Sequence, residues 1–165
     1  MREIRFRGRN IKTKDWVYGH LFYFDDGRYF ISPKGIDVEG DNGDYEGEYV
    51  LRGVLCVEVE PETVGQYTGL KDKNGVEIYE GDIVLIDDDG DSYVTDVYWG
   101  GEEYPAFDLN HRYIPSLWYY ESNVLSSIMN NDYETIKVIG NVYEHNHLLG
   151  WKRTLLFSRV LILIN

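Results

Sequence analysis

Short runs of β-branched and aromatic residues, each closed by Gly, Asp or Asn, are the feature that most limits how this chain can fold. Such runs are typical of antiparallel strands joined by turns. Neighbouring runs that flank a short polar turn are expected to pair as hairpins, one around residues 25–27 and one around residues 87–91. The runs predict strands at residues 4–7, 16–24, 28–32, 54–60, 83–86, 92–99, 106–109 and 135–143.

Helix signals are scarce and gather in one place. Over residues 117–129, apolar side chains recur three and four positions apart, which gives a helix one apolar face. We expect this helix to end at Asn130 and Asn131, because asparagine often terminates helices. Several short strands with one short helix predict a β-dominated fold that contains a small barrel.

The composition excludes a disordered chain. Of the 165 residues, 43% are hydrophobic and 15% are aromatic, which is enough apolar surface to offset the loss of chain entropy. A single cysteine, Cys56, allows no internal disulfide and no cysteine zinc cluster. Because Cys56 lies in an alternating run, we expect it to be buried and unreactive.

Charge is the next constraint. With 16 Lys and Arg against 29 Asp and Glu, the chain carries a net charge of −13, and such a field repels phosphate backbones and anionic lipid. The charge is unevenly spread: residues 1–14 hold six cations and one acid, whereas residues 77–103 hold ten acids and no Lys or Arg. These two segments are expected to attract each other or to make the molecule strongly dipolar.

Residues 63–84 read TVGQYTGLKDKNGVEIYEGDIV. The pair Asn74 and Gly75 favours a tight turn with positive φ at both residues, and Gly69 and Gly81 are expected at further bends. Asp82 is expected to fix a loop by accepting hydrogen bonds from backbone amides. The apolar residues of this segment are predicted to pack in the core of the small barrel, namely Val64, Tyr67, Leu70, Ile78, Tyr79, Ile83 and Val84.

This segment resembles the signature of the YopX-like family of phage and prophage proteins. Two further stretches, the opening MREIRFRG and the later VIGNVYEHNHLL at residues 138–149, agree with the same family in the same order. The resemblance implies a mainly β fold with a small, partly open barrel of the Src-homology-3-like type, additional antiparallel strands and a phage or prophage origin. It implies no known reaction and no cofactor. The signature positions are Gly65, Tyr67, Gly69, Leu70, Asn74, Gly75, Ile78, Tyr79, Gly81, Asp82, Gly140 and Asn141.

On this basis the chain divides into three parts. They are an N-terminal β-rich region with an acidic loop at residues 1–60, a YopX-like barrel core at 61–149 and an apolar extension at 150–165. The extension departs from the family pattern, and a bare strand so rich in Leu and Ile would aggregate. We therefore expect it to be covered by this chain or by another copy, and we expect a homo-oligomer.

The expected location is the cytoplasm of a bacterial host cell. The basic first residues lack the apolar segment of a secretory signal. The most apolar stretch, residues 154–164, contains Arg159 and is too short to cross a bilayer. We therefore expect no membrane partner.

Three groups of residues have the chemistry of metal ligands, and for each we expect no metal. The groups are His145 and His147 with Glu144; Asp37, Glu39, Asp41 and Glu48; and residues 87–91. For the first group, two imidazoles without a third ligand more often lie at the surface. The second group resembles a calcium loop, but such a loop needs a glycine at its sixth position, where this chain has Asn42. The third group has the composition of a charged hairpin turn.

No complete catalytic motif is present, so we expect no enzyme and no catalytic residues. The serines lack the glycines of a nucleophile elbow, and the four histidines show no recognisable spacing to a partner acid. No phosphate-binding glycine loop precedes a helix. The sole support for an enzyme is acid pairs such as Glu102 with Glu103, which arise by chance in a chain this acidic.

A non-enzymatic module that binds or regulates a host or phage protein is the favoured function. Tyrosine and tryptophan anchor many protein interfaces, and the chain has 15 Tyr and 4 Trp. Tyr113, Trp118 and Tyr119, beside the expected helix, are the candidate aromatic binding patch.

The alternative is a barrel that binds nucleic acid through its first strand. There, Ile4 and Phe6 are expected to face the core, whereas Arg5, Arg7 and Arg9 form a basic stripe on the other face. The net negative charge makes this alternative the less favoured one, and it fails if acidic residues neutralise the stripe.

Overall fold

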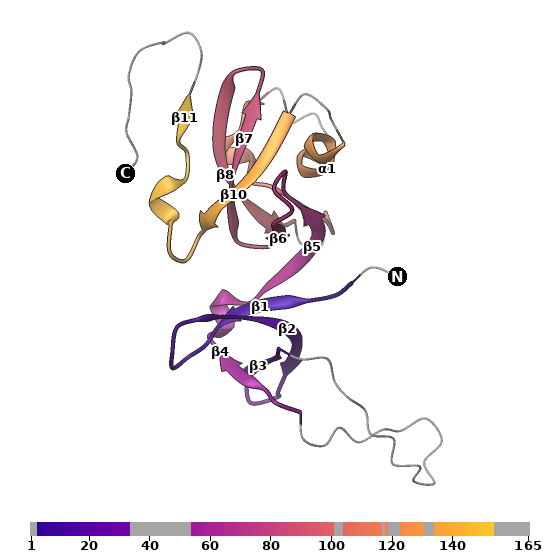
Figure 1. Ribbon diagram of the computed structural model, residues 1–165, viewed down its shortest axis with the longest axis vertical. Coiled ribbons are helices and arrows are strands. Elements are labelled where there is room, and N and C mark those ends of the chain that lie inside the picture. The colour runs from indigo at the N-terminus through magenta and orange to yellow at the C-terminus, as the bar shows by residue number, and fades with distance from the viewer. Residues whose placement is uncertain are drawn as a thin grey trace, which may run out of the picture. The chain divides into compact units, whose positions relative to one another are not determined.

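The computed structural model describes residues 3–33, 54–100, 104–116, 118, 123–130 and 134–153. The chain divides into two compact units, Met1–Tyr67 and Thr68–Asn165. Both are built mainly from antiparallel strands, and the described residues contain one short α-helix (Figure 1). The predicted mainly β fold class is therefore confirmed. Within the same ranges, no helix is long and apolar enough to cross a membrane.

The first unit is an antiparallel sheet in the order β4-β3-β2-β1-β5. The predicted hairpin of β2 and β3 is confirmed. The chain just after β1 also bonds back to β4, because the Glu60 N–H donates to the Arg9 carbonyl (2.8 Å) and Asn10 bridges Val59. The elements are β1 (Phe6–Arg9), β2 (Trp16–Tyr23), β3 (Tyr29–Ser32), β4 (Val57–Val59), the 3-10 helix η1 (Pro61–Thr63) and β5 (Gly65–Lys71), which continues into the second unit.

The core of the first unit packs tightly around Gly8 in β1. Ile31 and Val59 are buried, with exposed fractions of 0% and 1%. A Cβ atom on Gly8 would lie 2.9 Å from the Cβ of Val59 and 3.2 Å from the Cδ1 of Ile31. A glycine is therefore required for β1 to approach these two side chains so closely.

The predicted alternation of the first strand holds at Gly8, which faces the core, but the basic stripe is corrected at Arg7. Arg7 is 5% exposed, and its guanidinium carbon lies 4.9 Å from the ring centre of Trp16. A guanidinium is weakly hydrated and stacks well on an aromatic face, so it tolerates this burial. Ile4, which was expected in the core, is 59% exposed because β1 begins only at Phe6.

The prediction that Cys56 is buried is wrong. Its side chain is exposed, because the strand expected over residues 54–60 is confined to Val57–Val59. An exposed thiol is accessible to reagents in solution, unlike a cysteine in a core.

The second unit contains a sheet in the order β10-β7-β8-β11, with β9 paired to another part of β8. The predicted hairpin of β7 and β8 is confirmed, and both residues of its turn, Asp89 and Gly90, have positive φ (40° and 92°). The elements are β6 (Glu77–Tyr79), which pairs with β5, β7 (Asp82–Asp88), β8 (Asp91–Trp99), β9 (Phe107–Leu109), η2 (His111–Tyr113), α1 (Val124–Met129), β10 (Glu134–Asn141), η4 (Asn146–Leu148) and β11 (Lys152–Arg153).

The core of the second unit lies where α1 packs on β9 and β10 (Figure 1). Of the signature residues predicted for the core, five are buried and two, Val64 and Leu70, are half-buried. The five buried ones are Tyr67, which belongs to the first unit, and Ile78, Tyr79, Ile83 and Val84. The core cluster consists of Ile78, Val84, Ile86, Val97, Phe107, Leu109, Ile114, Val124, Leu125, Ile128 and Ile136.

The helix is shorter than predicted. It begins at Val124 because Asn123 has an extended backbone (φ −159°, ψ 102°) and its side-chain oxygen accepts a hydrogen bond from the Ser126 N–H at 2.6 Å. An asparagine in this position is an N-cap, which ends the helix on its N-terminal side. The predicted end at Asn130 is confirmed, whereas residues 117, 119–122 and 131 lie outside the described residues.

The packing around Gly8 generates a stability test. We expect Gly8→Ala to lower the free energy of unfolding by about 1–3 kcal/mol, because the added methyl group overpacks the site against Val59. Val59→Ala keeps the Cβ but removes Cγ2, which would also lie 2.9 Å from the new methyl group, so the double variant Gly8→Ala/Val59→Ala should lose less than the sum of the two single losses. Urea unfolding of the four proteins measures this cycle, and additive losses would contradict the close approach.

Candidate functional site

The signature turn at residues 72–76 is organised by one carboxylate, that of Asp72. One oxygen, Oδ1, accepts hydrogen bonds from the N–H groups of Asn74 (2.7 Å) and Val76 (2.9 Å). The other oxygen, Oδ2, accepts a hydrogen bond from the Val138 N–H at 3.0 Å, in β10. Gly75 has a φ of 80° but Asn74 does not have positive φ, so the prediction of positive φ at both residues is corrected to Gly75 alone.

The same turn covers the outer edge of β10. In addition to the bond from Val138 to Asp72, the Lys73 N–H donates to the carbonyl of Ile136 at 3.1 Å. An uncovered edge strand presents unpaired N–H and C=O groups to other chains. The turn therefore satisfies two backbone groups of β10 that a partner strand would otherwise bind.

The ionisation of Asp72 follows from these contacts. The carboxylate is 5% exposed, and this burial alone would raise its pKa. Hydrogen bonds from the backbone N–H groups of Val76, Val138 and Asn74 outweigh the burial, with help from Lys137, and the pKa of Asp72 is lowered from its ordinary value. Asp72 is therefore ionised at neutral pH, when its three hydrogen bonds are strongest.

The two signature segments far apart in the sequence meet at one end of β7 and β10. Asp82 lies opposite Asn141 in the paired strands. The Asp82 carboxylate is 1% exposed and accepts a hydrogen bond from the Tyr79 N–H at 2.8 Å, which confirms the loop-fixing role predicted for it. A Cβ atom on Gly81, whose φ is 79°, would lie 3.2 Å from the ring of Tyr143, so this bend favours glycine.

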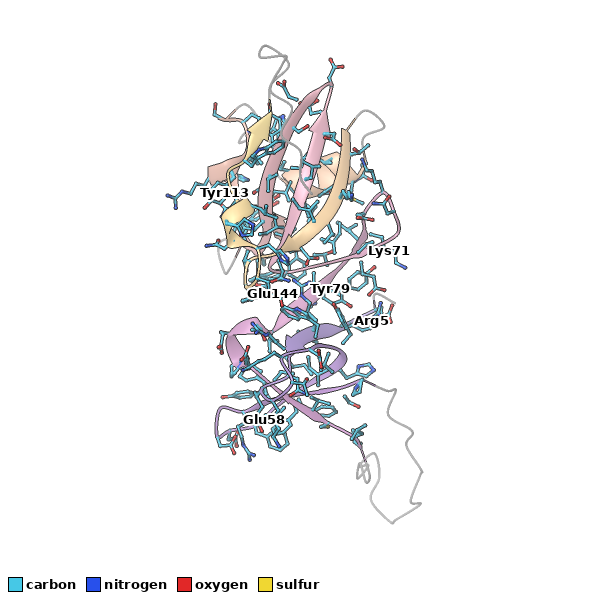
Figure 2. The ribbon with its side chains drawn as sticks, turned by 60° about the vertical axis from the view of Figure 1, so that its left-hand side comes forward. Arg5, Glu58, Lys71, Tyr79, Tyr113 and Glu144 are labelled. Carbon is cyan, nitrogen blue, oxygen red and sulfur yellow. The ribbon has the colours of Figure 1, made fainter. Side chains whose placement is uncertain are left out.

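Asn141 holds the turn that follows β10. Its side-chain oxygen accepts hydrogen bonds from the N–H groups of Tyr143 (3.1 Å) and Glu144 (3.0 Å), and its Nδ2 donates to the Glu144 carboxylate at 2.7 Å. Glu144 accordingly lies at this end of β10 (Figure 2). A Cβ atom on Gly140 would lie 2.8 Å from the ring of His145. The contacts of these residues thus maintain the turn.

The candidate metal ligands that the structure describes take part in hydrogen bonds or lie exposed. His145 Nδ1 accepts a hydrogen bond from the Asn141 N–H at 3.3 Å, and His147 is exposed. Asp87 accepts hydrogen bonds from Ser92 (2.9 Å), within the β7–β8 hairpin, and from Lys73 (3.5 Å), in the turn at residues 72–76. Within the ranges that the structure describes, no three His, Cys, Asp or Glu side chains are placed to hold a metal ion. The calcium-like residues Asp37, Glu39, Asp41 and Glu48 lie outside those ranges.

Several cations of the first unit lie next to carboxylates. Arg5 Nε lies 2.9 Å from a Glu3 carboxylate oxygen, and the Arg5 guanidinium also lies over the ring of Tyr67, 5.3 Å from its centre. Arg9 lies 3.8 Å from the Glu60 carboxylate, which also pairs with Lys14. Three of the N-terminal basic residues, Arg5, Arg9 and Lys14, are therefore paired with acids of their own unit.

The aromatic patch predicted beside the helix is only partly available at the surface. Trp118 is half-buried, packs against the core cluster and makes an edge-to-face contact with Tyr93, with ring centres 5.3 Å apart. Tyr113 is half-buried, and its ring lies 3.3 Å from the Cβ position of Gly150, just before β11 (Figure 2). Tyr119 lies outside the described residues.

The end of the β2–β3 hairpin exposes aromatic rings that were not selected from the sequence. Tyr23 is 59% exposed and its ring centre lies 5.0 Å from that of Tyr29, whereas Phe24 is 50% exposed and lies 5.1 Å from Phe30. Successive residues of a strand point to opposite faces, so both faces of this end carry an aromatic pair. The signal was the run LFYF next to an acidic turn, in which aromatic residues do not alternate with polar ones. We call Tyr23, Phe24, Tyr29 and Phe30 the hairpin-end patch.

The role of Asp72 generates a pH-dependent prediction. We expect Asp72→Asn to lower the free energy of unfolding by about 2 kcal/mol at pH 7. The amide replaces one acceptor oxygen of the carboxylate with a donor NH₂ group, and the hydrogen bonds that remain are made to an uncharged oxygen. The folded-state pKa of Asp72 is depressed, so its contribution is complete above its ordinary value of 3.8 and is lost as the pH falls through the folded-state pKa. The gap between wild type and variant should therefore shrink at low pH.

Urea unfolding at pH 7 and at pH 3 measures this gap. The matched control is Asp89→Asn, which removes one negative charge from an exposed turn and should change stability by less than about 0.5 kcal/mol. A gap for Asp72→Asn that is independent of pH would contradict the role given to the ionised carboxylate.

Comparisons with known proteins agree with the resemblance seen in the signature segments. The chain is similar to the solved structure of protein EF1440 from Enterococcus faecalis, at 26% sequence identity over 90% of this chain and 99% of that chain, with a TM-score of 0.53. No curated protein matches the chain. The family described as YopX protein matches residues 5–150. Because this match spans most of the chain, the protein belongs to the YopX family.

Proposed function

We propose that this protein is a non-enzymatic binding module that recognises a host or phage protein through the hairpin-end patch. The observation that carries the proposal is the exposure of Tyr23 and Phe24 at the same hairpin end, where each ring contacts a different ring of β3. Burying a large, solvent-exposed aromatic ring contributes much binding free energy, and aromatic residues often anchor protein interfaces. A partner that grips the hairpin end from both sides covers both rings.

The patch is held in position before any partner arrives. Each exposed ring contacts a second ring on the neighbouring strand, and Arg28 lies over the ring of Phe30 at 5.5 Å while it pairs with Asp26 at 2.7 Å. Side chains that are ordered in advance lose less conformational entropy on binding. This supports a specific interface at the hairpin end.

The charges favour a protein partner over nucleic acid. Binding to phosphates needs cations that are free to replace counterions. Arg7 is buried, and Arg9 and Lys14 share the carboxylate of Glu60. The hydrogen bond from Lys14, against some burial and with help from the charges of Lys14 and Arg9, keeps the pKa of Glu60 below its ordinary value, so these ion pairs persist at neutral pH.

We further propose a phage or prophage origin, a cytoplasmic location in the bacterial host and self-association into a homo-oligomer. The family membership supports the origin, and the apolar residues 154–164 support self-association. We also infer that the barrel core at residues 61–149 is partly open and of the Src-homology-3-like type. The strand order β10-β7-β8-β11, in which β8 also pairs with β9, supports a sheet that bends around the core cluster.

A capture experiment tests the proposed binding surface. We expect Tyr23→Ser/Phe24→Ser to lose any protein that the wild-type chain captures from a lysate of Enterococcus faecalis, the source of the structural neighbour. Both side chains are exposed, so the substitutions should leave the thermal unfolding midpoint unchanged within about 2 °C. Quantitative mass spectrometry of the captured proteins measures the loss.

The matched control is Trp151→Ser, which removes an aromatic side chain of similar exposure (46%) from the second unit. Capture that survives in this control and fails in the hairpin variant supports the proposal. Capture that is equal in both variants contradicts it. Binding of an oligonucleotide at low salt, measured by fluorescence anisotropy, would instead favour the nucleic-acid alternative.

Self-association is tested on the full chain by light scattering over a concentration series. We expect a mass that is a whole multiple of 19.3 kDa at micromolar concentration and that falls toward 19.3 kDa on dilution, because subunit association is governed by mass action. A mass of 19.3 kDa at every concentration would rule out the oligomer and leave the hairpin-end proposal untouched.

A further inference from the structure

A second exposed aromatic surface lies at the end of β8, in the second unit. Tyr98 is 37% exposed and Trp99 is 43% exposed. The Trp99 ring makes an edge-to-face contact with Phe107 on β9, with ring centres 5.0 Å apart. Tyr98 and Trp99 are successive residues of β8, so their rings lie on opposite faces of this paired strand, and Tyr98 shares its face with Asp96 and Asp108.

Two largely buried carboxylates, Asp96 and Asp108, lie beside Tyr98, close enough for their charges to act on its hydroxyl. Asp108 on β9 lies directly opposite Tyr98, and Asp96 lies two residues before Tyr98, on the same face of β8. Asp108 is 2% exposed, and its Oδ1 accepts a hydrogen bond from the Leu125 N–H at 3.0 Å. The Oδ1 atom of Asp96 is buried and has no hydrogen-bond partner among the described residues.

The pKa values of Tyr98 and Asp96 describe the electrostatic environment of this surface. Burial raises the pKa of the Tyr98 hydroxyl, and the charges of Asp108, Tyr104 and Asp96 raise it further. Burial also raises the pKa of Asp96, against the lowering effect of its hydrogen bond with Asn110. Burial disfavours charge of either sign, but the part of the Tyr98 shift that comes from the charges of Asp108 and Asp96 marks a negative potential, which attracts cations.

We propose that this surface, with Tyr98 at its centre, docks an arginine side chain of a protein partner. A guanidinium stacks on an aromatic face and is attracted by carboxylates, so it satisfies both features of the surface at once. The net charge of −13 adds a long-range attraction for a basic segment. The surface belongs to a different unit from the hairpin-end patch, so the protein has two docking surfaces and the failure of either leaves the other standing.

The test uses a blocked Gly-Arg-Gly-Arg-Gly peptide and the same peptide with citrulline in place of arginine. Citrulline keeps the shape of arginine but carries no charge. In ¹H–¹⁵N spectra of the full chain, we expect the arginine peptide to shift the backbone amide of Tyr98, and the citrulline peptide to leave it unchanged. Equal shifts with both peptides, or shifts confined to other residues, would overturn the proposal.

Two variants locate the binding energy. We expect Tyr98→Leu to weaken the arginine peptide about two- to fivefold, the range of a cation–π contact at an exposed site. Trp151→Leu, which replaces another exposed ring of the same unit, is the matched control and should leave the affinity unchanged. Unchanged affinity in Tyr98→Leu, with the fold shown intact by its spectrum, would overturn the assignment.

Binding should also depend on pH. Bound arginine favours ionised Asp96, so the affinity should fall as the pH is lowered through the raised pKa of Asp96, and Asp96→Asn should weaken this dependence. Besides Tyr98, Tyr104 and Asn110, the groups near Asp96 and Asp108 include His111, whose Nε2 lies 3.5 Å from Asp108 Oδ2. If the affinity of Asp96→Asn still depends on pH, the double variant Asp96→Asn/His111→Gln shows whether His111 causes the remaining dependence. A wild-type affinity that does not change with pH would contradict the part given to Asp96.

Discussion

One carboxylate determines how the signature turn and the β10 edge fit together. Asp72 accepts hydrogen bonds from two amides of its own turn and from Val138, 66 residues away. A buried acceptor with three donors fixes the position of each donor, because losing any one leaves a polar group unsatisfied. These bonds hold β10 on the side away from β7, and the β7–β10 pairing, whose register shifts between Val138 and Gly140, places Asp82 opposite Asn141.

The parts of the fold that could be predicted are those with local causes. Alternating runs and short polar turns predicted both hairpins, and an aspartate after a glycine bend predicted the role of Asp82. The role of Asp72 could not be predicted in this way, because its partner Val138 is remote in sequence. The predicted helix was too long at its N-terminal end. The apolar spacing begins at residue 117, whereas the cap at Asn123 makes the helix begin at Val124.

The surfaces were harder to predict than the core. Composition shows an excess of aromatic residues but does not tell a ring that covers a cation, such as Trp16 over Arg7, from one that faces water, such as Phe24. The same holds for charge, because Arg9 finds its acid only when Glu60 is brought beside β1. The candidate sites therefore depend on strand pairing, and both exposed surfaces were identified only from the structure.

The exposure of Cys56 gives the protein a natural attachment point for a probe. It is the single cysteine of the chain and lies just before β4, in the unit that carries the hairpin-end patch. A maleimide dye or spin label will therefore react at one known position without any change to the sequence. Labelled in this way, the native chain can report the arrival of a partner by fluorescence or by electron paramagnetic resonance.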